Sequence, residues 1–135
     1  DDYIQLIKPE NPQEQRRLQL ESIVNNYKWL AKSTKACAIL VSQLNRALES
    51  RVHQRPILSD LAESGSIEQV AENVWFLFYD YKINSVRSKF GANAIEVIGS
   101  KVRYGNSGNV TFGFDGDKVK FYNTTEEFKE ARRNA

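Results

Sequence analysis

The stretch Ala36-Cys37-Ala38-Ile39-Leu40-Val41 is an unbroken apolar run with the length of a β-strand. A strand that is buried on both faces has this composition, and such strands are typical of a parallel sheet covered by helices. Polar Ser42 and Gln43 follow directly at the C-terminal end of the run. Because ligands of open α/β sheets bind beyond the C-terminal ends of the strands, this point is a candidate ligand site.

Strand and helix patterns flank that run on both sides. Residues 13–33 carry apolar side chains at spacings of three and four, which predicts an amphipathic helix. Residues 2–7 are mostly apolar and precede Pro9, so we interpret them as the end of a buried strand. Further strands are predicted at residues 74–79, 95–102, 110–114 and 119–122, the last two forming a hairpin around Asp115-Gly116-Asp117.

Two capping patterns place short helices between and after these strands. Ser66 and Gln69 fit a capping box that begins a short helix, and Thr124 and Glu127 fit a second one before the C-terminal helix. Residues 80–93 are polar and are expected to form a mobile loop. The predicted fold is therefore α/β, with a mainly parallel sheet flanked by helices and an antiparallel C-terminal hairpin.

Length and composition exclude several classes of protein. The chain has 135 residues, a formal net charge of +2 and one cysteine, which fits a single nearly neutral domain. A strongly basic nucleic-acid protein, a disulfide framework and a four-cysteine zinc site are excluded. The longest apolar run is far shorter than the roughly 20 residues of a membrane span. A reducing, intracellular setting without a membrane partner is expected.

Four side chains are candidates for phosphate or metal chemistry. Asp2 stands beside an apolar strand, where an acidic group can hold magnesium, and Gln43 can orient a water or sense a phosphate. Lys101 and Arg103 alternate on a strand and so point the same way, as two cations that meet a phosphate would. Each candidate has a structural alternative. Asp2 would cap a strand end, and the Gln43 amide would form hydrogen bonds with the loop backbone. Lys101 and Arg103 would lie on a solvated edge strand, where cations prevent pairing with another chain.

Basic residues are concentrated in two loops. Residues 46–55 hold Arg46, Arg51 and Arg55 against one glutamate, and residues 82–103 hold five Lys or Arg against Glu96. An anionic partner would require such patches, although ordinary solvated loops have them too. Two other residues are set aside: His53 is the sole histidine, and Cys37 is expected to be a small core residue.

Several motifs occur together in one order along the chain. They are Asp2-Tyr3-Ile4-Gln5-Leu6, Leu30-Ala31-Lys32, Ser42-Gln43-Leu44-Asn45-Arg46, Arg55-Pro56-x-x-Ser59-Asp60-Leu61-x-Glu63-Ser64-Gly65-Ser66-Ile67-Glu68-Gln69 and Lys101-x-Arg103-x-Gly105. With them the sequence resembles the C-terminal half of the RecA-like (P-loop NTPase) motor domain of DnaB-type replicative DNA helicases. The resemblance implies that residues 1–123 are part of this domain and that residues 124–135 form a C-terminal helix or tail.

The resemblance also implies residue roles in ATP hydrolysis. Asp2 matches the Walker B aspartate that holds Mg²⁺, and Gln43 matches the glutamine that senses the γ-phosphate. Lys101 and Arg103 match the lysine and the arginine finger that reach the ATP of a neighbouring subunit. These four residues are the implied nucleotide-binding set, and Gln43, Lys101 and Arg103 are the implied catalytic residues.

The segment from 46 to 66 matches the loop that lines the DNA channel in this family. Glu63 and Gly65 match positions that contact the phosphates of the single strand, and Arg46, Arg51 and Arg55 are candidates for further contacts. Ala62 stands where the family usually has a basic residue, so one phosphate contact of the family is not matched.

The resemblance thus implies a fragment of an ATP-dependent helicase that translocates on single-stranded DNA and unwinds duplex DNA as a hexameric ring. ATP and Mg²⁺ would be its cofactors, primase and a helicase loader further partners, and the cytoplasm of a bacterium or a phage-infected cell its location. The sequence holds no Gly-x-x-x-x-Gly-Lys-Ser/Thr loop, so the 135 residues alone are expected to be inactive. Alternatives are another RecA-like ring ATPase, or a non-catalytic truncated module that binds helicase subunits or DNA.

Overall fold

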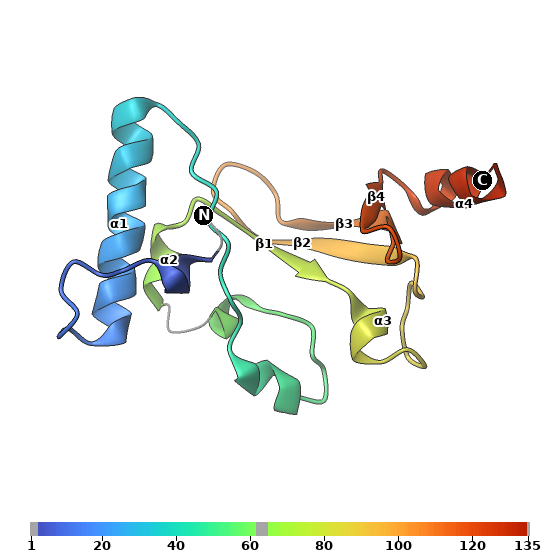
Figure 1. The fold of residues 1–135 in the computed structure, drawn as a ribbon, viewed down its shortest axis with the longest axis horizontal. Coiled ribbons are helices and arrows are strands. Elements are labelled where there is room, and N and C mark those ends of the chain that lie inside the picture. The colour runs from blue at the N-terminus through green and yellow to red at the C-terminus, as the bar shows by residue number, and fades with distance from the viewer. Residues whose placement is uncertain (1–2, 62–64, 135) are drawn as a thin grey trace. The chain divides into compact units, whose positions relative to one another are not determined.

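A computed structural model describes residues 3–61 and 65–134 of the chain, which form two compact units. The first unit comprises residues 1–53 and 57–74, and the second comprises residues 54–56 and 75–135. The chain therefore passes into the second unit for three residues, 54–56, returns to the first, and crosses again inside a strand. Figure 1 shows the elements of both units along the chain.

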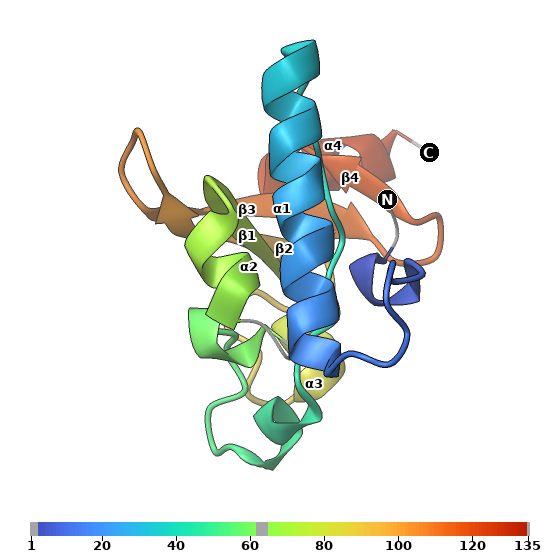
Figure 2. The same cartoon turned by 90° about the vertical axis from the view of Figure 1, so that its left-hand side faces the viewer.

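The first unit is built on two helices. Helix α1 (Arg16–Thr34) packs beside the short helix α2 (Gly65–Val70), as Figure 2 shows, and each helix buries apolar side chains, Leu20 in α1 and Ile67 in α2. The sequence prediction of a helix at residues 13–33 is confirmed. Lys35 ends α1 in the left-handed region at φ 56°, and its N–H donates to the Ala31 carbonyl.

Two predicted strands of the first unit differ from the structure. Residues 4–6 form a 3-10 turn (Ile4–Leu6), and residues 36–41 belong to no strand among the described residues. Ile39 is 70% exposed, and Cys37 is exposed, so the prediction of a buried strand with a core cysteine is wrong here. The two segments are still neighbours, because Ile4 N–H donates to the Val41 carbonyl at 2.8 Å. An apolar run becomes a buried strand only where other elements cover it, and composition does not show whether they do.

The predicted capping box at Ser66 is not formed. Helix α2 begins one residue earlier, at Gly65, which places Ser66 inside its first turn. The buried Ser66 Oγ has no hydrogen-bond partner in the part of the chain that the structure describes, so it does not cap the helix there. The prediction of a short helix before residue 74 is confirmed.

The second unit is a four-stranded sheet with the order β1-β2-β3-β4. Its strands are β1 (Asn73–Phe78), which begins in the first unit, β2 (Ala94–Val102), β3 (Gly108–Asp115) and β4 (Lys120–Tyr122). Antiparallel pairing joins β2 to β3 and β3 to β4, with Ile95 opposite Phe112. The predicted C-terminal hairpin is confirmed, but the described strands do not show the mainly parallel sheet that the apolar run at 36–41 suggested.

Helix α4 (Thr125–Arg133) packs against β3. The Thr124 hydroxyl accepts from Glu127 N–H at 3.1 Å, as the capping pattern predicts, while the Glu127 carboxylate accepts from Asn123 N–H at 2.8 Å. The division of the chain at residue 123 stays a prediction.

Residues 80–93, predicted to be a mobile loop, have local order. Helix α3 (Asp80–Ile83) begins the segment, and the Asp80 carboxylate accepts from the Ser88 hydroxyl and from Lys89 N–H at 2.6 and 2.8 Å. Gly91, at φ 72°, closes the turn by donating its N–H to the Ser88 hydroxyl. Polar composition alone does not distinguish such a self-bonded loop from a mobile one.

Gly113 sets how closely α4 approaches the sheet. A Cβ atom at this position would lie 2.5 Å from the Thr124 carbonyl oxygen and 2.8 Å from Phe128 Cβ. We therefore expect Gly113→Ala to lower the free energy of unfolding by about 1–3 kcal/mol, because the helix must move off the strand. Urea-induced unfolding measures this difference. Gly108→Ala, on the same strand but with open space around its Cβ, is the matched control, and equal losses for both variants would contradict the packing argument.

Candidate functional site

The structure distributes the predicted site residues between the two units. Asp2 and Glu63 lie outside the described residues. The first unit holds Gln43, Arg46, Arg51 and Gly65, and the second holds Arg55, Lys101 and Arg103. Gly65 is the exposed first residue of α2. The described site residues fall into three groups along the chain: one at Gln43, one along the segment 45–61, whose residues 54–56 belong to the second unit, and one at the end of β2.

Gln43 lies beside the 3-10 turn at residues 4–6. Its N–H donates to Gln5 Oε1 at 3.3 Å, and Gln5 Nε2 donates to the Ser42 hydroxyl at 3.1 Å. Arg16 in turn donates to the Gln5 carbonyl at 2.5 Å. Gln5 was missed as a site residue, although a lone polar residue between Ile4 and Leu6 is a visible signal. It holds the backbone after residue 41 and leaves Gln43 at an exposed position.

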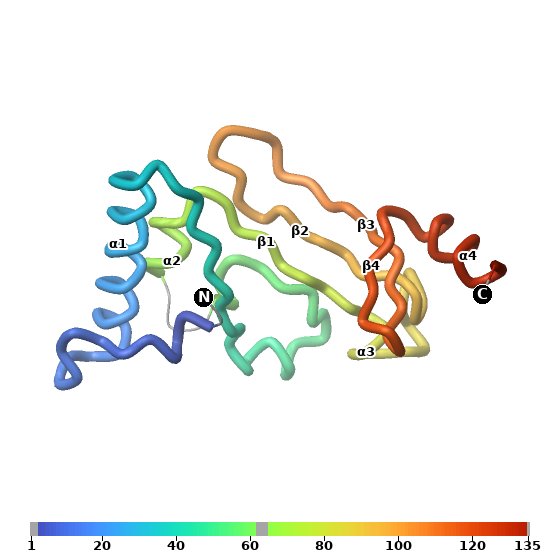
Figure 3. Tube along the Cα trace, turned by 45° about the horizontal axis from the view of Figure 1, so that its top comes forward, coloured from blue at the N-terminus to red at the C-terminus, as the bar shows by residue number. Residues whose placement is uncertain are grey.

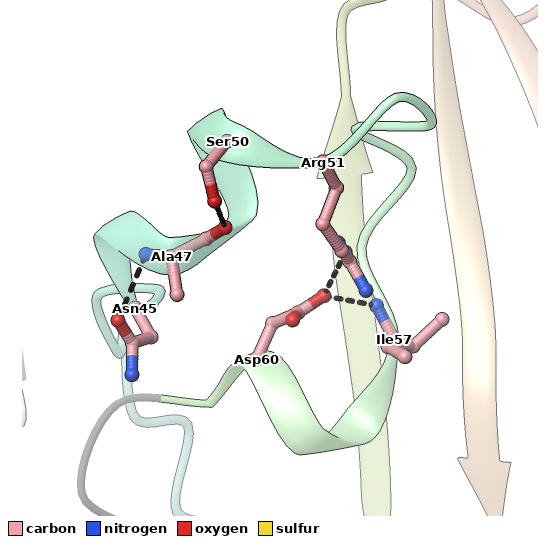
Figure 4. A network of polar contacts seen from close by, with 6 residues as sticks. All are labelled: Asn45, Ala47, Ser50, Arg51, Ile57 and Asp60. Atoms are coloured by element: carbon pink, nitrogen blue, oxygen red, sulfur yellow. Dashed lines mark hydrogen bonds and ion pairs between the residues drawn. The ribbon is translucent and has the colours of Figure 1, made fainter.

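The segment 45–61, here called the basic loop, is held by internal polar contacts, drawn in Figure 4. Asn45 Oδ1 accepts from Ala47 N–H at 2.9 Å and so caps the 3-10 turn Arg46–Ser50. The far end closes back on this cap, because Asn45 N–H donates to the Asp60 carbonyl at 2.7 Å. Arg46 follows the cap directly and is exposed, so its charge stands at the start of a fixed turn.

Asp60 is the anchor of the basic loop in the first unit. Its side chain is 10% exposed, and Oδ2 accepts from Arg51 Nη2 at 2.6 Å and from Ile57 N–H at 2.8 Å. A buried carboxylate requires such partners, since an unpaired charge away from water is costly. Arg51, predicted from its charge alone, is therefore part of the loop's own framework.

Arg55 is anchored in the second unit by Glu96 on β2. The guanidinium donates from Nη1 to Oε2 at 2.5 Å and from Nη2 to Oε1 at 2.9 Å, and the Glu96 side chain is 7% exposed. Hydrogen bonding to Glu96 is the main reason that the pKa of Arg55 is raised above its ordinary value. The guanidinium carbon also lies 5.6 Å from the centre of the Phe78 ring. Glu96 was not identified as a site residue from the sequence.

Lys101 and Arg103 lie where β2 leaves the sheet. Figure 3 shows β2 and β3 running side by side up to the loop that joins them. Lys101 is half-buried within β2, and Arg103 is exposed in the loop directly after it. Gly99 permits the close pairing here, because a Cβ would lie 3.0 Å from the Gly108 carbonyl oxygen. Two cations thus lie two residues apart, one at the end of β2 and one in the loop after it, and together they can stabilise negative charge on a phosphate. The prediction that both lie on a strand is wrong for Arg103.

No group of three or more His, Cys, Asp or Glu side chains that could hold a metal ion occurs within residues 3–61 and 65–134. The predicted magnesium ligand, Asp2, lies outside those ranges. Across the described part of the chain, no helix is long and apolar enough to cross a membrane.

Comparison with known proteins agrees with the family resemblance. The model of the DnaB-like helicase C-terminal domain matches residues 2–123. The replicative DNA helicase DnaB of Geobacillus stearothermophilus is 39% identical over 132 residues, which is 97% of this chain and 29% of that protein. The DnaB helicase of Pasteurella multocida is 39% identical over 126 residues, which is 93% of this chain and 27% of that protein. The chain thus spans just over a quarter of the length of these relatives.

Solved structures show the same relationship. A solved ATPase domain matches with a TM-score of 0.85 at 37% identity, over 90% of this chain and 42% of that one. A DnaB-like replicative helicase, studied with its interactions with primase, matches with a TM-score of 0.84 at 36% identity, over 90% of this chain and 29% of that one. The order of elements from α1 to α4 is therefore that of a segment of a RecA-like ATPase domain, and the chain belongs to the DnaB-like helicase C-terminal domain family.

Proposed function

We propose that the chain acts as part of an ATP-dependent replicative DNA helicase that forms a hexameric ring, translocates on single-stranded DNA and unwinds duplex DNA. The observation that carries the proposal is the match of nearly the whole chain to replicative helicases at 39% identity. In this role ATP and Mg²⁺ are the cofactors. Primase, which the related helicase structure was studied with, and a helicase loader are partners, and the cytoplasm of a bacterium or a phage-infected cell is the location.

The nucleotide roles follow from the family positions and from the local geometry. Lys101 and Arg103 serve a neighbouring subunit's ATP, which is supported by the position of Lys101 at the end of β2 and of Arg103 in the loop directly after it. Gln43 senses the γ-phosphate from an exposed position fixed through Gln5. Asp2 would hold Mg²⁺, because it matches the Walker B aspartate of the family. When bound, the metal neutralises charge on the phosphates, and the cations of this chain add to that effect as the phosphoryl group is transferred.

The DNA roles belong to the basic loop and to the start of α2. Arg46 and Gly65 are exposed, and Glu63 matches a position that contacts the DNA strand in the family that this chain resembles. We assign to them contacts with the phosphates of single-stranded DNA. Arg51 contributes positive charge while Asp60 fixes its guanidinium. The fixed turn lowers the entropic cost of binding, because a preorganised loop loses less freedom when DNA binds.

The arginine-finger role predicts a specific kinetic defect. In a chimera in which residues 2–123 replace the matching segment of a DnaB-type helicase, we expect Arg103→Ala to lower kcat for ATP by about 1,000-fold or more. ATP affinity should change little, since the finger acts mainly in the transition state. Steady-state kinetics measure kcat, and nucleotide binding followed by fluorescence measures ATP affinity. Arg87→Ala, at an exposed arginine of the same unit, is the control, and parallel losses of binding and turnover would refute the finger role.

The 135-residue chain by itself should not hydrolyse ATP, because its sequence contains no phosphate-loop motif to cradle the triphosphate. Phosphate release by the purified chain measures this directly. Turnover above background that Arg103→Ala abolishes would contradict the expectation, whereas turnover that Arg103→Ala leaves unchanged would indicate a contaminating enzyme.

The assignment of the basic loop predicts salt-dependent binding of single-stranded DNA. Neutralising Arg46 by Arg46→Gln should weaken binding of a fluorescent oligonucleotide and reduce the slope of log K against log salt by about 0.7. Arg17→Gln removes the same charge from an exposed position in the first turn of α1 and should leave the slope unchanged. An identical slope for the two variants would show that Arg46 does not contact the phosphates of the DNA.

A further inference from the structure

Arg55 differs from Arg46 and Arg51 in having its partner on the sheet of the second unit. Its partner Glu96 is 5% exposed as a residue and is the third residue of β2. A carboxylate at this depth is stable as an anion only while a cation or several donors face it. The bidentate fork of Arg55 supplies that partner with two N–H groups at once. The guanidinium of Arg55 therefore binds to the protein's own sheet.

Three consecutive strands contribute to this arrangement. Phe78 of β1 lies under the guanidinium, and Glu96 of β2 takes the bidentate pair. Asn109 of β3, in the amide orientation that satisfies both of its polar groups, accepts from Arg55 Nη2 at 3.1 Å and donates to the Gly108 carbonyl at 3.1 Å. The register places Ile98 opposite Asn109 and Thr111 opposite Glu96, so Glu96 and Asn109 share one face of the sheet.

We propose that Arg55 is a positioning residue of the DNA-binding segment and not one of its phosphate contacts. Its pairing with Glu96 holds residues 54–56 on the sheet of the second unit, and the chain of the basic loop enters and leaves at these residues. This proposal rests on the proposed function, because it assigns Arg55 a role in binding single-stranded DNA. The same strand carries Lys101 five residues further on, roughly 17 Å at strand spacing. Strand β2 thus carries both the partner of Arg55 and the cation at the strand end.

A single substitution distinguishes a positioning role of Arg55 from direct contact with phosphate, because the two roles predict opposite changes in DNA affinity. Glu96→Gln removes a negative charge and keeps the shape of the side chain. If Arg55 contacted phosphate, the change would release its guanidinium and remove a repulsive charge, so DNA affinity would rise. If Arg55 positions the loop, the change weakens the anchor and DNA affinity falls. Simple electrostatics and the positioning role therefore give opposite expectations.

The experiment measures binding of the 135-residue chain to a fluorescent single-stranded oligonucleotide at several salt concentrations. We expect Glu96→Gln and Arg55→Gln each to weaken binding by about threefold to tenfold, and the double variant to be no weaker than either single variant. Glu130→Gln, an exposed glutamate on α4, removes the same charge and should not weaken binding. Tighter binding by Glu96→Gln together with weaker binding by Arg55→Gln would overturn the proposal, and so would unchanged binding by both.

Hydrogen exchange provides a readout that does not need DNA. In Glu96→Gln we expect faster exchange of the Ile57 amide, which donates to Asp60 Oδ2 next to the anchored residues 54–56, with the amides of β3 unchanged. If the unsubstituted chain binds no oligonucleotide, the proposed function fails, whereas the anchoring is still judged by this local exchange. No local increase would overturn the positioning role whatever the binding result.

Discussion

Two buried carboxylates, one in each unit, fix the loop on which the proposed DNA-binding surface depends. Asp60 takes Arg51 and the Ile57 backbone amide in the first unit, and Glu96 takes Arg55 in the second. Removing one partner of a buried pair typically costs about 3–5 kcal/mol, against at most about 1 kcal/mol for an exposed pair. Arg55 is itself 42% exposed, so its pair lies between these limits. The carboxylates nevertheless determine where the arginines can point.

The sequence identified the arginines of this loop but not their partners. A count of charges between residues 46 and 55 shows a basic segment, because it needs only the order of residues. Asp60 lies nine positions from Arg51, and Glu96 lies 41 positions from Arg55. Whether such distant carboxylates meet the arginines depends on how the chain turns back, which no local pattern contains. The same limit explains why Gln5 was missed as a contact of Gln43, 38 residues away.

The elements that were predicted correctly are those whose determinants are local. Thr124 meets the backbone of Glu127 three residues later, and the β3–β4 hairpin turns at Asp115-Gly116-Asp117. The prediction at residues 36–41 failed because burial of a strand is a property of its neighbours. Residues 95–102, by contrast, were correctly predicted as a strand, and β3 pairs with this strand, β2, after a short loop. Sequence pattern therefore predicted the second unit better than the first.

Ion pairs with carboxylates of the same chain reduce the net positive charge that the arginines of the loop offer to DNA. Two of its three arginines face carboxylates of the same chain, so the long-range attraction for an anion is smaller than the count of arginines suggests. A helicase that translocates must release each phosphate as readily as it binds it, which excessive positive charge would hinder. Using arginine charge for internal anchors gives the loop a defined shape, and in the proposed DNA-binding role it keeps each phosphate contact weak. In that role the geometry of the loop, more than its total charge, determines how the strand is held.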